Sequence, residues 1–135
     1  METQNFNTPL KSYKDLIVWK SSMNLVLDIY RISSVFPKSE QLILTSQMRR
    51  SAISVPSNIA EGWSRNSARS FNYFLKIASG STSELMTQVE IALRLNYLPP
   101  EKANEITLKG NKISKMLIAL IRKVEIREKA RKASE

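Results

Sequence analysis

The chain has 135 residues and a formal net charge of +9, from 21 Lys or Arg against 12 Asp or Glu. Because it contains no Cys and no His, it lacks disulfide, thiolate and imidazole chemistry, which removes the usual general base near neutral pH and the usual zinc ligands. The length suits one domain with a proper core, and only 3 Gly with long apolar-periodic segments favour an all-helical fold.

The sequence also argues against an enzyme. It contains no S-x-x-K, no glycine-rich phosphate loop and no H-E-x-x-H motif. We therefore expect no catalytic site, no cofactor and no metal, although a site made only of carboxylates stays formally open. The start METQNFNTPL lacks a basic leader followed by an apolar run, and no apolar run has the length of a membrane span, so we expect a cytoplasmic protein without membrane attachment.

Residues 1–12 show no period and are predicted to form a flexible N-terminal arm. A first helix should begin near Tyr13 to Asp15 and end before Pro37, and Ser39 or a neighbour can cap the next helix. Apolar residues step by three and four along the first helix, which predicts that they form its buried seam: Leu16, Trp19, Met23, Val26 and Tyr30.

The second helix, over Leu44 to Gly62, is the most distinctive stretch of the chain. One stripe is apolar and predicts core residues: Leu44, Met48, Ala52, Val55 and Ile59. The adjacent stripe carries short hydrogen-bonding groups where an exposed face would carry Lys and Glu, so we expect close helix approach and paired buried groups: Gln47, Ser51, Ser54, Asn58 and Glu61.

Two residues should shape the end of this helix. Pro56 removes a backbone donor, so the helix is predicted to be kinked or broken there, as a packing kink or as a kink at a binding surface. Gly62 suits the left-handed position just past a helix C-terminus. Arg49 and Arg50 fall off both stripes and are free to face solvent or a partner.

A third helix should run from about Ser67 to Asn96, with an apolar side of Phe71, Phe74, Ala78, Leu85, Val89 and Ala92. Between Ala78 and Leu85 this side carries Ser81 among small residues, which permits close contact with the polar stripe of the second helix. Glu84 can then complete a hydrogen-bonded network with Asn58 or Gln47. Arg65, Arg69 and Lys76 share another face, with Arg94 further along, and form either a phosphate-facing stripe or a solvated face.

A fourth helix should start at Pro100 and Glu101. Its apolar stripe includes Gly110, which costs about 1 kcal/mol relative to Ala and is expected to mark a close helix crossing: Ile106, Gly110, Ile113, Leu117, Leu120 and Val124. Lys123, Arg127 and Arg131 form one row near the end, and residues 129–135 are predicted to be a basic, frayed tail. Four such helices joined by short connections predict an antiparallel up-down-up-down four-helix bundle over residues 13–128.

The positive charge raises nucleic acid as a partner, because phosphate binding grows with the cations offered and the counterions released. The basic residues concentrate in residues 31–80 and in residues 101–135, the latter with ten Lys or Arg against five Glu. The candidate contacts share only their positive charge and their positions off the core stripes: Arg49, Arg50, Arg65, Arg69, Lys76, Arg94, Lys123 and Arg127.

Several short motifs of the sequence resemble those of one bacterial protein family. They include VWK at 18–20, FP at 36–37, QMRRSAISVPSNIAEG at 47–62 with Arg65, GS at 80–81, and NYL at 96–98. The family is the four-helix bundle family encoded within 23S rRNA intervening sequences, sometimes labelled ribosomal, and the resemblance spans about residues 13–122. It implies a homo-oligomer, a ring of about five subunits, and the cations it marks are Arg49, Arg50 and Arg65. A more distant resemblance, to the accessory protein of diversity-generating retroelements, implies contacts with nucleic acid and a reverse transcriptase.

Two function hypotheses follow. The first is a non-catalytic nucleic-acid-binding bundle, with RNA preferred to DNA, in which an oligomer combines several basic stripes to bind by charge and shape. The second is an assembly or adaptor protein that binds a protein partner such as a reverse transcriptase and uses its charge for steering or solubility. Under either hypothesis the polar residues of the second and third helices can be structural, fixing helix register or a subunit interface.

Overall fold

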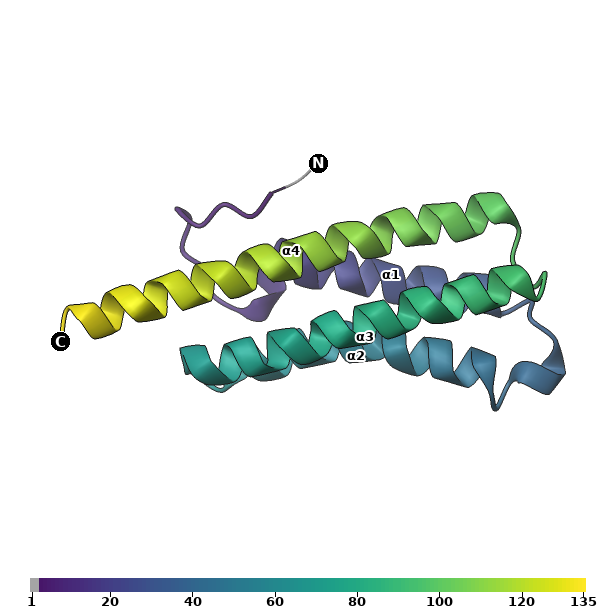
Figure 1. Ribbon diagram of the computed structural model, residues 1–135, viewed down its shortest axis with the longest axis horizontal. Helices are drawn as coiled ribbons and strands as arrows, with labels where there is room; N and C mark the ends of the chain where they lie inside the picture. Colours follow the sequence, from purple (N-terminus) through teal and green to yellow (C-terminus); the bar gives the residue numbers. More distant parts are fainter. Residues whose placement is uncertain (1–2) are drawn as a thin grey trace.

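The computed structural model describes residues 3–135, and within them the chain is helical without any strand (Figure 1). Four α-helices account for most of it: α1 Ile17–Ser33, α2 Leu44–Ser64, α3 Ala68–Arg94 and α4 Pro100–Ala133. Two short 3-10 turns, η1 Tyr13–Asp15 and η2 Lys38–Glu40, precede α1 and α2. The all-helical fold with four helices is confirmed.

Each helix packs against two others, so the four surround one core. α1 contacts α2 and α4, and α3 contacts the same two helices. Figure 1 shows the α2–α3 and the α3–α4 connections at opposite ends of the molecule, and the C-terminal end of α4, drawn in yellow, extends past the ends of α2 and α3. This packing is that of a helical bundle.

Local sequence signals place most of the helix ends. Ser12 accepts a hydrogen bond from the Lys14 amide, while Asp15 Oδ2 accepts from the amides of Lys11 and Ser12. These bonds lower the pKa of the Asp15 carboxyl, because they favour its charged form. Ser67 caps α3 by accepting from the Ser70 amide. The start of α4 at Pro100 agrees with the prediction.

Other predicted helix ends are wrong. Ser39 lies inside η2 and caps nothing, because α2 begins only at Leu44. Gly62 lies within α2, which continues to Ser64, and the left-handed residue of that connection is Asn66, with φ 57°. A Cβ at residue 62 would stand 2.8 Å from Phe74 Cβ, so Gly62 serves close packing of α2 on α3. The helix also continues through Pro56, so the predicted break does not occur there.

The buried faces of α2 and α4 are the predicted ones. On α2 the five apolar residues from Leu44 to Ile59 are all buried, and on α4 every predicted residue from Ile106 to Leu120 is buried. Gly110 lies against Met86 of α3, whose side chain fills the space that a Cβ would need, so the predicted close crossing is present. On α3, Leu75 and Thr82 join the predicted core, while Phe71 and Phe74 are only half-buried.

The predicted seam of α1 is right only in part: Leu16 is buried, and Trp19 and Val26 are half-buried against the core. Met23 and Tyr30 are exposed, at 39% and 41%, and the buried stripe is instead Val18, Ser22, Leu25, Ile29 and Ser33. Two serines can lie in this stripe because their hydroxyls are paired with backbone carbonyls: Ser22 Oγ donates to Trp19 O and Ser33 Oγ donates to Ile29 O. α1 is therefore apolar on two faces, and only one of them faces the core.

Candidate interaction surfaces

The polar stripe of α2 lies along the line where α2 meets α3. Ser54 Oγ and Ser81 Oγ are 2.8 Å apart and join the two helices. The Asn58 side-chain amide donates to Ser54 O at 2.8 Å and to Ser54 Oγ at 2.9 Å. All three residues are half-buried, so this short chain of hydrogen bonds is partly shielded from water. The structure thus brings together Ser54, Asn58 and Ser81.

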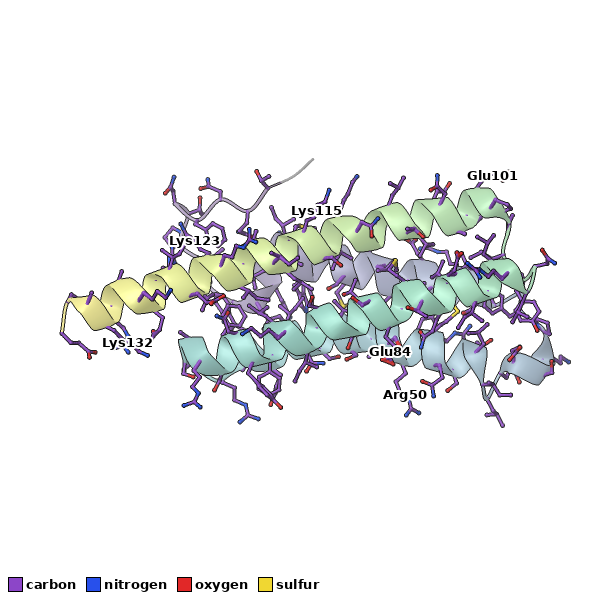
Figure 2. The ribbon with its side chains drawn as sticks, viewed as in Figure 1. Arg50, Glu84, Glu101, Lys115, Lys123 and Lys132 are labelled. Carbon is purple, nitrogen blue, oxygen red and sulfur yellow. The ribbon has the colours of Figure 1, made fainter. Side chains whose placement is uncertain are left out.

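The other residues of the predicted network are placed differently. Ser51 is buried, whereas Gln47, Glu61 and Glu84 are exposed. Glu61 accepts from the Arg65 guanidinium rather than from a group on α3. Figure 2 shows Glu84 and Arg50 on the side of the bundle away from α4, and the two form no ion pair within the described residues. The hydrogen-bonded network between α2 and α3 therefore includes only Ser54, Asn58 and Ser81 of the seven residues predicted for it.

Two buried side-chain oxygens, one on α2 and one on α3, were not anticipated from the sequence. Thr45 Oγ1 on α2 and Gln88 Oε1 on α3 are buried without a hydrogen-bond partner among the described residues. A buried acceptor without a partner costs stability, so such groups are rare in folded proteins. No periodicity could reveal them, because both residues occupy ordinary positions of the buried faces.

Arg49 is engaged within the bundle. Its guanidinium donates to Ser33 Oγ at 3.0 Å and to Tyr30 O at 3.3 Å, and Cζ lies 4.5 Å from the centre of the Tyr30 ring. These contacts join α2 to α1. Arg49 therefore has a structural role, which leaves less of its hydrogen-bonding capacity for a ligand.

Two further predicted cations form ion pairs one turn away on their own helices. Arg65 Nη2 lies 2.7 Å from Glu61 Oε1, and its Cζ lies 5.3 Å from the centre of the Phe74 ring. Arg94 Nε lies 3.2 Å from Glu90 Oε1. All four charged side chains are about half exposed or more, so these pairs are weak and salt-sensitive.

Three predicted cations remain open to solvent. Arg50 on α2 and Arg69 and Lys76 on α3 are exposed, and none forms an ion pair with a described residue. The exposed apolar residues Ile53, Tyr73 and Ile77 lie on the same two helices. Gly80, in the middle of α3, is exposed too, and a Cβ there would meet no atom within 4 Å. The outer sides of α2 and α3 thus combine charge, apolar groups and open backbone.

The N-terminal arm covers the two predicted cations of α4. Lys123 Nζ and Arg127 Cζ lie 5.3 Å and 5.7 Å from the centre of the Phe6 ring. Gln4 Oε1 accepts from the Ile17 amide at 2.7 Å and so ties the arm to the start of α1. Between the arm, α1 and α4 lies a largely apolar cavity of about 330 Å³. Its lining offers no cluster of groups that could catalyse a reaction.

The end of α4 remains helical through residues 129–133, where the sequence predicts a frayed tail. Arg131 is held there by two carboxylates, since its guanidinium pairs with Glu128 at 2.8 Å and with Glu135 at 2.6 Å. The Arg131 hydrogen bond lowers the pKa of Glu128, while burial opposes this shift. Arg131 is therefore held by carboxylates, whereas Lys123 and Arg127 of the same row lie over the Phe6 ring.

Four cations on α4 were missed by the sequence analysis. Lys112, Lys115, Arg122 and Lys129 are exposed, and none forms an ion pair with a described residue. Their offsets of three, seven and seven place them on one face of the helix. This spacing is visible in the sequence and could have predicted the row. The sequence analysis instead predicted the neighbouring row of Lys123, Arg127 and Arg131.

Two kinds of site were looked for among residues 3–135, a group of metal ligands and a membrane-spanning helix. No group of three or more His, Cys, Asp or Glu within residues 3–135 is arranged to hold a metal ion. None of the described helices has both the length and the hydropathy that a membrane crossing requires.

The Tyr97 hydroxyl donates to Glu40 Oε2 at 2.9 Å, which raises the pKa of Tyr97 because the neutral phenol is the form that donates.

Comparison with known proteins points to one family. The family model described as 23S rRNA-intervening sequence protein matches residues 14–119. Among solved structures, a protein of unknown function from the S23 ribosomal protein family of Bacteroides thetaiotaomicron superposes with a TM-score of 0.73 and 24% sequence identity. That match covers 78% of this chain and 96% of the Bacteroides chain, and it supports the fold alone. No curated protein matches the chain.

Proposed function

The chain belongs to the 23S rRNA-intervening sequence protein family, and from that premise we propose that it is a non-catalytic nucleic-acid-binding protein that acts as a small oligomer. The observation that carries the proposal is the excess of exposed cations without carboxylate partners, among them Arg50, Arg69 and Lys76. Such cations can replace the counterions condensed on a nucleic acid, and the released counterions favour binding. RNA is the preferred ligand and the cytoplasm the proposed location.

Binding by charge and shape fits the surface better than base recognition. Proteins that read single strands stack bases on exposed aromatic rings. The exposed aromatic residues of the described chain are Tyr30 and Tyr73, and the Tyr30 ring is covered by Arg49. A surface with many cations and few free rings favours contacts with phosphates.

The outer sides of α2 and α3 support the oligomer. Ile53, Tyr73 and Ile77 are exposed there, and Gly80 leaves the α3 backbone open to close approach. A second copy would cover these apolar groups. A ring of about five copies, which the family resemblance implies, would then turn several weak phosphate contacts into a usable affinity.

The test is a binding titration of the nuclease-treated full chain. A structured RNA and a DNA duplex, each with a fluorescent label, are followed by anisotropy across a salt series. We expect micromolar or tighter binding of RNA, with a logarithmic salt dependence whose slope reports the number of phosphate contacts. Absence of binding at low salt would overturn the proposal. The mass of the particle in solution, measured by light scattering, tests the oligomer separately.

An assembly or adaptor protein is the second candidate, because the same exposed apolar residues of α2 and α3 could bind another protein, such as a reverse transcriptase. The variant Asn58→Ala separates the possibilities. Loss of stability or of the oligomer with unchanged RNA affinity in the assembled fraction would assign the polar line to structure. Loss of RNA affinity in a stable oligomer would assign it to the ligand.

Two finer features of the fold belong to the same proposal. We propose that consecutive helices run antiparallel, which their short connections favour. We also propose that α2 bends near Pro56, because this residue cannot donate the backbone hydrogen bond of its turn.

A further inference from the structure

We propose that the outward face of α4 binds the phosphate backbone of double-stranded RNA through a row of four cations, Lys112, Lys115, Arg122 and Lys129. This inference rests on the nucleic-acid-binding function proposed above. It assigns that function to one surface and to one form of ligand.

The row lies opposite the buried side of α4. The buried residues, from Ile106 to Leu120, face the core, whereas all four cations are exposed. Figure 2 shows Lys115 on the outer edge of α4, turned away from α3. Because α4 also extends past the ends of α2 and α3, the far end of the row stands clear of those helices (Figure 1). A long ligand can therefore lie along this face without meeting them.

The charges of the row are not neutralised within the chain. Two carboxylates of α4 and one just past its end are already paired with other cations, since Glu105 pairs with Lys102, and Glu128 and Glu135 pair with Arg131. Glu125 lies one turn from Arg122 and from Lys129 but forms no ion pair with either. The four cations therefore keep their full charge for an external anion.

The spacing of the row suits a rigid double helix. At 1.5 Å per residue, Lys112 and Lys115 are about 4.5 Å apart along the axis, and each following step is about 10.5 Å. The whole row spans about 26 Å, less than the roughly 34 Å of one turn of B-form DNA, so its four cations can reach phosphates within about one turn of a duplex. Since the row contains no aromatic residue, it offers no platform on which a single strand could stack.

Two asparagines beside the row favour RNA. Asn104 and Asn111 are exposed, and their offset of seven residues places them on one side of the same face. Their amide groups can donate to and accept from 2′-hydroxyls, which RNA has and DNA lacks. Cations would thus supply most of the affinity, and the two amides would supply the preference for RNA.

The test compares two full-length variants with the same net charge. The first carries Lys112→Gln, Lys115→Gln, Arg122→Gln and Lys129→Gln, and the matched control carries Lys11→Gln, Lys14→Gln, Lys20→Gln and Lys38→Gln, at exposed positions outside the candidate contacts. Each is titrated by anisotropy with a labelled RNA duplex of about two turns, a DNA duplex of the same sequence and the single RNA strand, over a salt series. Circular dichroism verifies that both variants remain folded.

We expect the α4 variant to bind the RNA duplex at least tenfold more weakly, with a salt slope reduced by about three to four, as for the loss of four phosphate contacts. The control should lose only a few-fold through its lower net charge. The variant Asn104→Ala with Asn111→Ala should bind the two duplexes equally while keeping the salt slope of the wild type.

The inference is overturned if the control loses as much affinity as the α4 variant, or if the wild type binds the single strand or the DNA duplex as tightly as the RNA duplex. In each of these cases the wild type still binds nucleic acid, so the proposed function stands. A wild type that binds none of the three probes overturns the proposed function itself.

Discussion

The α2–α3 pair and the α1–α4 pair are packed in opposite ways. α2 and α3 approach so closely that a Cβ on Gly62 would collide with Phe74, and Ser54 and Ser81 share a hydrogen bond across the line of contact. Between α1 and α4 there are instead two cavities, of about 330 and 300 Å³, and an ion pair of 2.6 Å between Asp28 and Lys109. Small side chains allow α2 and α3 to approach closely, whereas larger side chains at the α1–α4 contact leave cavities between the helices.

The largest expected effect on the free energy of unfolding comes from the α1–α4 pair, and it tests whether the buried face of α1 is well packed. Leu25→Ala, on the buried face of α1, should lower the free energy of unfolding by about 2–5 kcal/mol, because it leaves a cavity. Met23→Ala, on the exposed face of the same helix, should change it by about 0.5 kcal/mol or less. Urea denaturation of both variants measures the difference. Equal costs would mean that the outer face of α1 is covered in solution.

The next effect tests the close approach of α2 and α3. Gly62→Ala should destabilise the protein by about 1–3 kcal/mol, because the new methyl group meets Phe74 Cβ and the Phe71 carbonyl. Gly80→Ala is the matched control, since open space surrounds that position, and it should stabilise the chain by about 0.5–1 kcal/mol. Thermal and urea unfolding report both. A Gly80→Ala variant that loses the oligomer would instead place Gly80 against a neighbouring copy.

A smaller effect measures the hydrogen bond between the two helices. Ser54→Ala and Ser81→Ala, alone and combined, form a double-mutant cycle around the Oγ pair. We expect a coupling energy of about 0.5–1.5 kcal/mol, typical of a neutral hydrogen bond. A coupling energy near zero would show that packing alone holds α2 to α3. Ser57→Ala, at an exposed position of α2, should leave stability unchanged.

The smallest expected effect is on the pH dependence of stability. It arises outside the α2–α3 and α1–α4 pairs, at the end of the bundle where Tyr97 donates to Glu40. The folded-state pKa of Tyr97 is raised above 10.0, so its contribution to stability is complete below pH 10 and is lost as the pH rises through the raised value. Stability should therefore fall above pH 10 more steeply in the wild type than in Tyr97→Phe. Parallel pH profiles of the two proteins would contradict this.

The helices themselves could be predicted because their signals are local. The predicted apolar faces of α2, from Leu44 to Ile59, and of α4, from Ile106 to Leu120, were confirmed, since these helices concentrate their apolar residues on one side. α1 failed this test because it is apolar on two sides, and a periodicity cannot tell which of two stripes faces the core. Gly62 was assigned to a turn because glycine serves turns and close contacts alike, and only the position of Phe74 decides between them.

Composition and periodicity by themselves determined an all-helical chain of four helices and its uncompensated charge, because both depend on residues close together in sequence. The family followed from the resemblance of short motifs, chiefly that at residues 47–62. The tertiary structure alone decided which cations are open. Arg49 is engaged by Tyr30 and Ser33, and Lys123 by Phe6, all contacts between residues far apart along the chain. Lys112 and Lys115 also line cavities beside α1, but they stay exposed and form no ion pair with a described residue.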